Sequence, residues 1–109
     1  EDYEFGRIRI DGSDYQRDVI VLPQRVYGPW WRADGHDLIP ADLDPVRAEL
    51  PPRLVVGTGH YGRMAVPEAT LRTLGEWGLT VEALPTPRAV ERLQGEPAHG
   101  WAAALHLTC

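Results

Sequence analysis

LVVGTGHYG, residues 54–62, is the stretch that decides the fold. Its first three residues are typical of a short buried strand, and the glycines that follow predict a loop at the end of that strand. A helix is predicted to begin at Val66-Pro67-Glu68, because proline is favoured at the first helical position. Residues 79–84 are the next predicted strand. This strand–helix–strand order indicates parallel pairing with a right-handed crossover.

The chain that follows repeats the same alternation. Thr86 and Pro87 predict the start of a helix whose inward face carries Ala89, Val90 and Leu93. Residues 101–107, WAAALHL, are almost continuously apolar. A strand of that composition is buried on both faces, so we expect it at the centre of the sheet.

The chain that precedes the glycine-rich loop is predicted to hold a hairpin and one short helix. Residues 4–10 and 15–22 read as two strands joined by the turn signal Asp11-Gly12. Residues 24–41 are irregular apart from a possible short strand near residues 25–27. Asp42 is predicted to cap a helix that buries Leu43, Val46 and Leu50.

These elements predict an α/β domain over residues 1–109. The order is β-β-α-β-α-β-α-β, with helices covering the sheet and the N-terminal hairpin completing one side of it. The apolar faces of the helices are expected to pack in the core. A chain of 109 residues is the usual size of one domain with one core.

Composition excludes several classes of function. The net charge is −5, and the eleven cations are all arginine and never form a run, so no basic face for nucleic acid is predicted. The single cysteine, Cys109, rules out an intramolecular disulfide and favours a reducing compartment. No apolar stretch approaches the ~20 residues of a membrane span, and no signal or transit segment opens the sequence. We therefore expect a soluble, cytoplasmic protein.

The glycine-rich loop matches the dinucleotide fingerprint G-x-G-x-x-G over residues 57–62, and Glu82 lies where a ribose-binding acid would stand. In that fingerprint the helix begins within the glycines, so that its N–H groups meet the pyrophosphate. Pro67 would break such a helix, and the predicted helix starts about five residues too late. Dinucleotide binding is therefore not expected, and no cofactor is predicted.

The same loop supports a weaker hypothesis. Ligands of open α/β sheets prefer the carboxyl edge, where Thr58, His60, Tyr61 and Arg63 could line a small pocket. There His60 would be the natural acid or base and Arg63 would hold an anion. The alternative is that the glycines only allow the backbone to turn tightly.

The adjacent Trp30 and Trp31, followed by Arg32, are a second candidate site. We expect both rings to pack against the N-terminal hairpin. In the alternative interpretation, successive side chains of an extended segment point opposite ways, so that one ring is core and the other an exposed anchor for a partner.

No complete catalytic or metal-binding constellation is present. The four histidines, at positions 36, 60, 99 and 106, are too dispersed for a metal site, and each is expected to be a solvated or hydrogen-bonded single residue. His106 and Cys109 would face opposite sides of a strand, which disfavours a catalytic pair. Asp42 and Asp44 read as capping and solvated acids. No catalytic residue and no metal ligand are predicted.

Several stretches together resemble one known family. They are Phe5-Gly6-Arg7-Ile8, Trp30-Trp31-Arg32, Gly35-His36, Gly57-Thr58-Gly59 with Tyr61-Gly62 and Met64, Val66-Pro67, and residues 104–109, ALHLTC. This combination, spread over nearly the whole chain, resembles the small Mth-domain family, whose members include an adipogenesis-associated protein and a mitochondrial complex I assembly factor.

The resemblance implies a single compact three-layer α/β fold with a mixed central sheet, an N-terminal hairpin and three helices. It brings no set of catalytic residues, and the bacterial members mostly have no assigned activity. The mitochondrial relative works through protein partners. We therefore expect a non-catalytic interaction or assembly-type domain, monomeric or homodimeric, with an unidentified protein partner. The alternative is a small-molecule or anion binder, or an enzyme, that uses residues 57–62.

Overall fold

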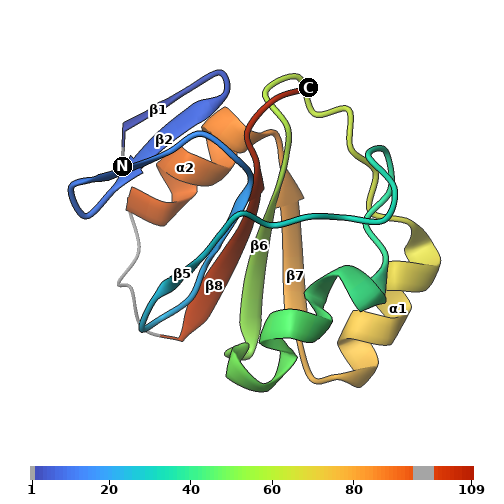
Figure 1. The fold of residues 1–109 in the computed structure, drawn as a ribbon. Helices are drawn as coiled ribbons and strands as arrows, with labels where there is room; N and C mark the ends of the chain where they lie inside the picture. Colours follow the sequence, from blue (N-terminus) through green and yellow to red (C-terminus); the bar gives the residue numbers. More distant parts are fainter. Residues whose placement is uncertain (1, 95–99) are drawn as a thin grey trace.

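The computed structural model describes residues 2–94 and 100–109. Two sheets and three helices make up the fold (Figure 1). The strands are β1 Asp2–Glu4, β2 Arg7–Ile10, β3 Ser13–Tyr15, β4 Val19–Val21, β5 Val26–Tyr27, β6 Arg53–Thr58, β7 Thr80–Leu84 and β8 Trp101–His106, and the helices are the 3₁₀ helix η1 Pro40–Glu49, α1 Glu68–Glu76 and α2 Thr86–Gln94.

The larger sheet is mixed and has the strand order β5-β4-β8-β6-β7. Strands β6, β7 and β8 are parallel, while β4 runs antiparallel to both β5 and β8. The predicted parallel pairing and the central position of residues 101–107 are therefore confirmed. Ala102, Ala103 and Ala104 of β8 are almost completely buried, as a strand covered on both faces requires.

Two apolar clusters cover the two faces of this sheet. One lies between the sheet and the layer formed by η1 and α1, and it includes Trp30, Leu43, Leu74 and Ala102. The other lies between the sheet and the layer formed by α2 and the small sheet. Figure 1 shows this arrangement, with α2 and the small sheet on one side of β6 and β8 and with η1 and α1 on the other. The three-layer α/β architecture is confirmed.

The N-terminal segment departs from the prediction. The turn at Asp11-Gly12 forms, with φ of 50° and 83°, but the predicted strand over residues 15–22 breaks into two. Residues 13–15 pair with β2 in a separate antiparallel sheet of order β1-β2-β3, whereas residues 19–21 join the main sheet beside β8. The break falls at Gln16-Arg17-Asp18, where the apolar pattern is interrupted. The predicted N-terminal hairpin therefore forms a small sheet of its own, and only the end of its predicted second strand joins the main sheet.

The helices follow the predicted faces with three exceptions. Leu50 lies just after the end of η1 and is only half-buried. Asp42 is not the N-cap, because η1 already begins at Pro40; its carboxylate instead accepts from the backbone N–H of Ile39 at 3.0 Å. In α1, the spacing of Leu71, Leu74 and Trp77 predicts that all three face inward; Leu74 is buried accordingly, but Leu71 is 40% exposed. Thr70 takes the inward position, and its hydroxyl donates to the carbonyl of Leu38 at 2.7 Å. Between residues 2 and 94 and from 100 to 109, no helix is long and apolar enough to cross a bilayer.

Candidate functional site

A buried cluster of charged side chains lies at the carboxyl edge of the main sheet. Asp18, Arg32 and His106 come from three distant parts of the chain, and their side chains are only 15%, 6% and 13% exposed. Arg32 Nη1 donates to Asp18 Oδ2 at 2.5 Å, and His106 Nδ1 lies 2.8 Å from the same oxygen. The other carboxylate oxygen accepts from the backbone N–H of Leu107 at 2.8 Å. Both oxygens of Asp18 are therefore satisfied.

Sheet register explains how Asp18 and His106 meet. Val19 pairs with Leu105 in antiparallel register, so that Asp18, one residue earlier, lies beside His106 at the end of β8. The segment that carries Arg32 is fixed to the same place, because the N–H of Trp30 donates to the carbonyl of Asp18 at 2.7 Å. The Arg32 guanidinium lies 5.0 Å from the centroid of the Trp30 ring, a cation–π contact.

The neighbours of Asp18 favour its ionised form. Burial by itself would raise the pKa of Asp18, but the hydrogen bonds from His106, Arg32 and Leu107 outweigh burial and hold that pKa below its usual value. An ionised carboxylate 2.8 Å from Nδ1 of His106 requires a proton on that nitrogen. The 3.2 Å approach of Arg32 Nη2 to the same Nδ1 is then a packing contact, because both groups carry protons.

The network continues to the glycine-rich loop through Tyr3. The Tyr3 hydroxyl donates to the carbonyl of Leu107 at 2.9 Å and lies 3.1 Å from His60 Nδ1. Burial, together with the charges of Asp18 and Tyr61, raises the pKa of Tyr3 to about 12. The small sheet is thus attached to the carboxyl edge of the main sheet by polar contacts.

Oxygen atoms of the protein itself accept hydrogen bonds from the backbone N–H groups of the glycine-rich loop. The N–H of Gly59 donates to Thr86 Oγ1 at 2.9 Å, that of His60 to the Thr108 carbonyl at 2.6 Å, and that of Arg63 to the Cys109 carbonyl at 3.2 Å. A Cβ at Gly59 would lie only 2.4 Å from the Cys109 carbonyl oxygen. Gly59 is therefore needed because residues 108 and 109 pass against the loop, and these N–H groups are not directed at a ligand.

The two tryptophans have opposite environments. Trp30 is 2% exposed and packs under η1, where its Nε1–H donates to the Asp42 carbonyl at 2.9 Å, whereas Trp31 is 70% exposed. The expectation that both rings pack against the hairpin was therefore wrong. The segment is extended, so successive side chains point to opposite sides, and the hairpin lies in the layer on the far face of the sheet.

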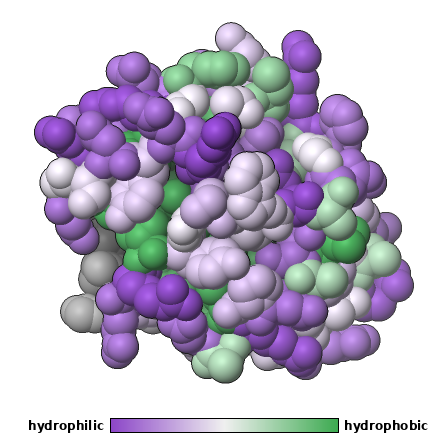
Figure 2. Space-filling view, in the orientation of Figure 1, coloured by the Kyte–Doolittle hydropathy of each residue, from purple (hydrophilic) through white to green (hydrophobic). Residues whose placement is uncertain are grey.

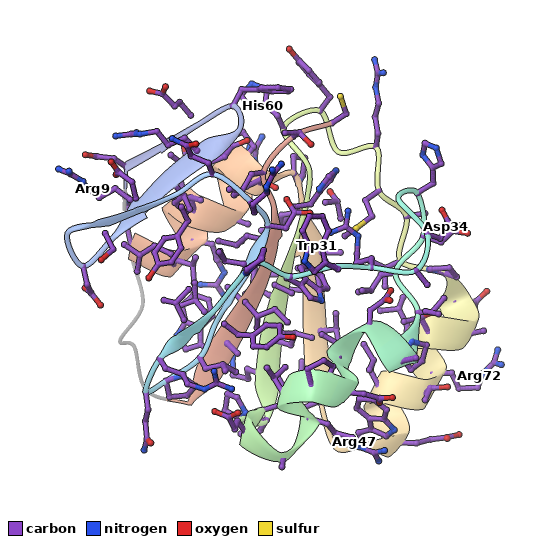
Figure 3. The ribbon with its side chains drawn as sticks, viewed as in Figure 1. Arg9, Trp31, Asp34, Arg47, His60 and Arg72 are labelled. Atoms are coloured by element: carbon purple, nitrogen blue, oxygen red, sulfur yellow. The ribbon has the colours of Figure 1, made fainter. Side chains whose placement is uncertain are left out.

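Exposed aromatic rings gather around this edge. Phe5 is 48% and Tyr61 63% exposed, and both rings contact the ring of His60, at centroid distances of 5.5 and 4.8 Å. Arg63 lies 5.7 Å from the Tyr61 ring, and Arg17 lies 5.9 Å from the Trp31 ring. In Figure 3, His60 is at the end of the molecule that carries the small sheet, and Trp31 is below it, in front of the main sheet.

The predicted site residues thus fall into two groups. Trp30, Trp31 and Arg32 lie together on one extended segment, and Thr58, His60, Tyr61 and Arg63 lie on β6 and the loop after it. The side chains of Thr58 and His106 are in register on neighbouring strands. Asp18, Tyr3 and Phe5 also belong to this region, although the sequence did not predict them as site residues. A polar residue directly before the β-branched run 19–21 was the available signal for Asp18.

Metal-ligating side chains do not converge in the part of the chain that the structure describes, where no group of three or more His, Cys, Asp or Glu residues could hold an ion. His99 lies outside the described residues. His106 is hydrogen-bonded and largely buried rather than solvated.

Residues 1–105 match the family described as "Protein of unknown function (DUF498/DUF598)", which is the Mth-type domain that the sequence resembles. The conserved hypothetical protein PH1505 from Pyrococcus horikoshii OT3 is 26% identical, with a TM-score of 0.82 over 100% of this chain and 98% of that one. MT938 is 23% identical, with a TM-score of 0.79 over 100% and 96%. XCC1710 from Xanthomonas campestris is 19% identical, with a TM-score of 0.78 over 98% and 82%.

Proposed function

The chain belongs to the DUF498/DUF598 family of proteins of unknown function, and we propose that it is a non-catalytic protein-interaction domain of the assembly type. The observation that carries this proposal is the pairing of exposed aromatic rings with arginines at the carboxyl edge of the main sheet. We call Phe5, Arg17, Trp31, Tyr61 and Arg63 the aromatic edge.

The composition of the aromatic edge is that of an interface. Aromatic residues and arginine are enriched in protein–protein interfaces, and tryptophan, tyrosine and arginine dominate the binding energy of known ones. Trp31 is 70% exposed, so the exposed part of its ring does not stabilise the fold. Burying the ring against a partner would remove this apolar area from water.

Charge at the aromatic edge indicates the kind of partner. Within residues 2–94 and 100–109, neither Arg17 nor Arg63 forms an ion pair with a carboxylate, in contrast to Arg25, which is paired with Glu49 at 2.6 Å. A partner segment that presents an apolar side chain flanked by carboxylates would satisfy both the rings and the guanidinium groups.

The buried network supports this role by holding the edge in place. Trp31 is flanked by Trp30 and Arg32, whose side chains are both buried and hydrogen-bonded. Tyr3 fixes the segment before Phe5 and contacts His60, the neighbour of Tyr61. Pre-organised aromatic side chains lose little conformational entropy on binding, which favours affinity.

Anion or metabolite binding at residues 57–62 is the alternative function. Because the N–H groups of Gly59, His60 and Arg63 donate to carbonyl or hydroxyl oxygens of the protein, a loop-amide cradle is not available to an anion. Only side chains such as those of His60 and Arg63 remain for that role. No observation favours it over the aromatic edge.

The test is affinity capture from the native cell with the wild type, Trp31→Ala and Leu71→Ala, quantified by mass spectrometry. Leu71 is the matched control, because it is also an exposed large apolar residue but lies on α1. We expect a protein captured by the wild type and by Leu71→Ala and lost with Trp31→Ala. Titration of that purified protein should then show binding to Trp31→Ala at least about ten-fold weaker, as for a hot-spot residue. Equal capture by all three variants would contradict the proposal.

A further inference from the structure

A cavity lies away from the aromatic edge, between the main sheet and the layer of α2 and the small sheet. Its volume is about 370 Å³. The walls come from β2, β4, α2 and β8, and they include Ile8, Ile10, Val21, Val90, Leu93 and Ala103. Figure 2 shows hydrophobic side chains at the bottom of a hollow on the side of the molecule that carries the small sheet.

The cavity has a cause in the sequence. Ala103 of the central strand faces this layer and lies between the large side chains of Trp101 and Leu105 on the same face. The small side chain leaves space that Ile8 and Ile10, on a separate sheet, do not fill. Protein interiors are otherwise close-packed, with few voids larger than a water molecule.

Size and chemistry point to a bound small molecule. Ligand pockets usually measure roughly 300–1,000 Å³, and an apolar cavity of only about 150 Å³ already binds benzene. No charged side chain is among the described residues that line the cavity, and Gln94, at the rim, is the one lining residue with a polar side chain. A charged ligand would leave its ion unpaired in an apolar site, which is costly. An uncharged, hydrocarbon-rich ligand fits both the walls and the volume.

We infer that this cavity is a binding site for a small, uncharged, hydrocarbon-rich molecule, separate from the aromatic edge. The site uses the face of β8 toward α2, whereas Trp31 lies on the segment that follows the buried Trp30 of the opposite cluster. Ligand binding and partner binding are therefore expected to respond to different substitutions.

The experiment is a fluorescence titration of the full chain with the neutral probe N-phenyl-1-naphthylamine. We expect saturable binding at one site in the wild type. Ala103→Leu fills the bottom of the cavity, and Val21→Phe fills it from the half-buried margin, so each should weaken binding at least ten-fold while the circular dichroism spectrum stays native. Trp31→Ala should bind the probe like the wild type, even if this variant fails in partner capture.

Three outcomes would overturn the inference. They are the absence of saturable binding to the wild type, wild-type affinity in both filled variants, and loss of binding in Trp31→Ala. If Ala103→Leu does not fold, the result with Val21→Phe decides, because Val21 is only half-buried and its replacement can extend into the opening.

Discussion

Both faces of β8 carry alanine side chains, but different layers cover the two faces. Ala102 and Ala104 face η1 and α1, where Trp30, Leu43 and Leu74 complete a close-packed cluster. Ala103 faces α2 and the small sheet, where about 370 Å³ remains open. On the first face the ring of Trp30, which comes from the segment between β5 and η1, packs in the cluster that covers these alanines. On the second face the large ring is Trp101, which lies on β8 itself beside Ala103 and lines the open space. The small alanine side chains of a central strand leave space on each face of the sheet. The side chains of the layer that covers each face determine whether this space is filled.

Removal of the Trp30 ring should open a cavity on the face of β8 that η1 and α1 cover, which we call the closed face, and should cause the largest loss of stability. Trp30→Ala deletes a fully buried ring and the hydrogen bond from Nε1 to the Asp42 carbonyl. We expect a loss of about 3–5 kcal/mol in the free energy of unfolding, measured by urea denaturation. A loss below about 1 kcal/mol would mean that the ring does not fill this face.

Disruption of the buried cluster of Asp18, Arg32 and His106, at the end of the same face, should cause the second-largest loss of stability. Asp18→Asn leaves Arg32 without its carboxylate partner, and breaking a buried ion pair costs about 3 kcal/mol or more at pH 7. Since the folded state lowers the pKa of Asp18, its stabilisation is present above about pH 4 and is lost as pH falls through the folded-state pKa. Denaturation at a series of pH values should therefore show an acid-dependent loss in the wild type that Asp18→Asn lacks. Parallel pH profiles would contradict the role of Asp18.

The same replacement, alanine to leucine, made once on each face of β8 tests how differently the two faces are packed. Ala102→Leu adds three carbons to the closed face and should destabilise the protein by about 1–3 kcal/mol through overpacking. Ala103→Leu adds the same group toward the cavity and should change stability by less than about 1 kcal/mol in either direction. Thermal and urea denaturation of the two variants would measure this difference. Equal losses would show that the two faces are packed alike.

The smallest effect on stability is expected at Trp31, directly beside the residue with the largest one. The Trp31 side chain is 70% exposed, so that Trp31→Ala should shift the free energy of unfolding by no more than about 0.5 kcal/mol. Denaturation of Trp30→Ala and Trp31→Ala in the same buffer makes the contrast direct. A large loss at Trp31 would place that ring in the fold rather than at an interface.

Local sequence patterns predicted the second half of the fold. The order β6-α1-β7-α2-β8 follows from strand runs, Pro67 at the start of a helix, and an apolar final strand, all of which are local signals. The only local signal for the break at residues 16–18 is the interruption of the apolar pattern there. The contact of Asp18 with His106, 88 residues away, was not predictable from local patterns. The exposures of Trp30 and Trp31 likewise depend on which layer covers residues 28–32.

The candidate site was predictable only in part, for a related reason. Trp31, Tyr61 and Arg63 stood out by residue type and by their place next to glycine-rich or extended segments. Phe5 and Tyr3 reach the same edge because the small sheet docks there, where the Tyr3 hydroxyl and the Gly6 N–H both donate to the Leu107 carbonyl. Likewise, nothing in the local pattern reveals that residues 108 and 109 occupy the amides of His60 and Arg63.

The most direct test of the difference between the two faces of β8 is a crystal structure of the protein under xenon pressure. Xenon occupies dry apolar cavities and leaves close-packed regions empty. We expect xenon beside Ala103, Ile8 and Val90, and none between Ala102 and Trp30. A crystal with no xenon beside Ala103, or with xenon on both faces of β8, would contradict it.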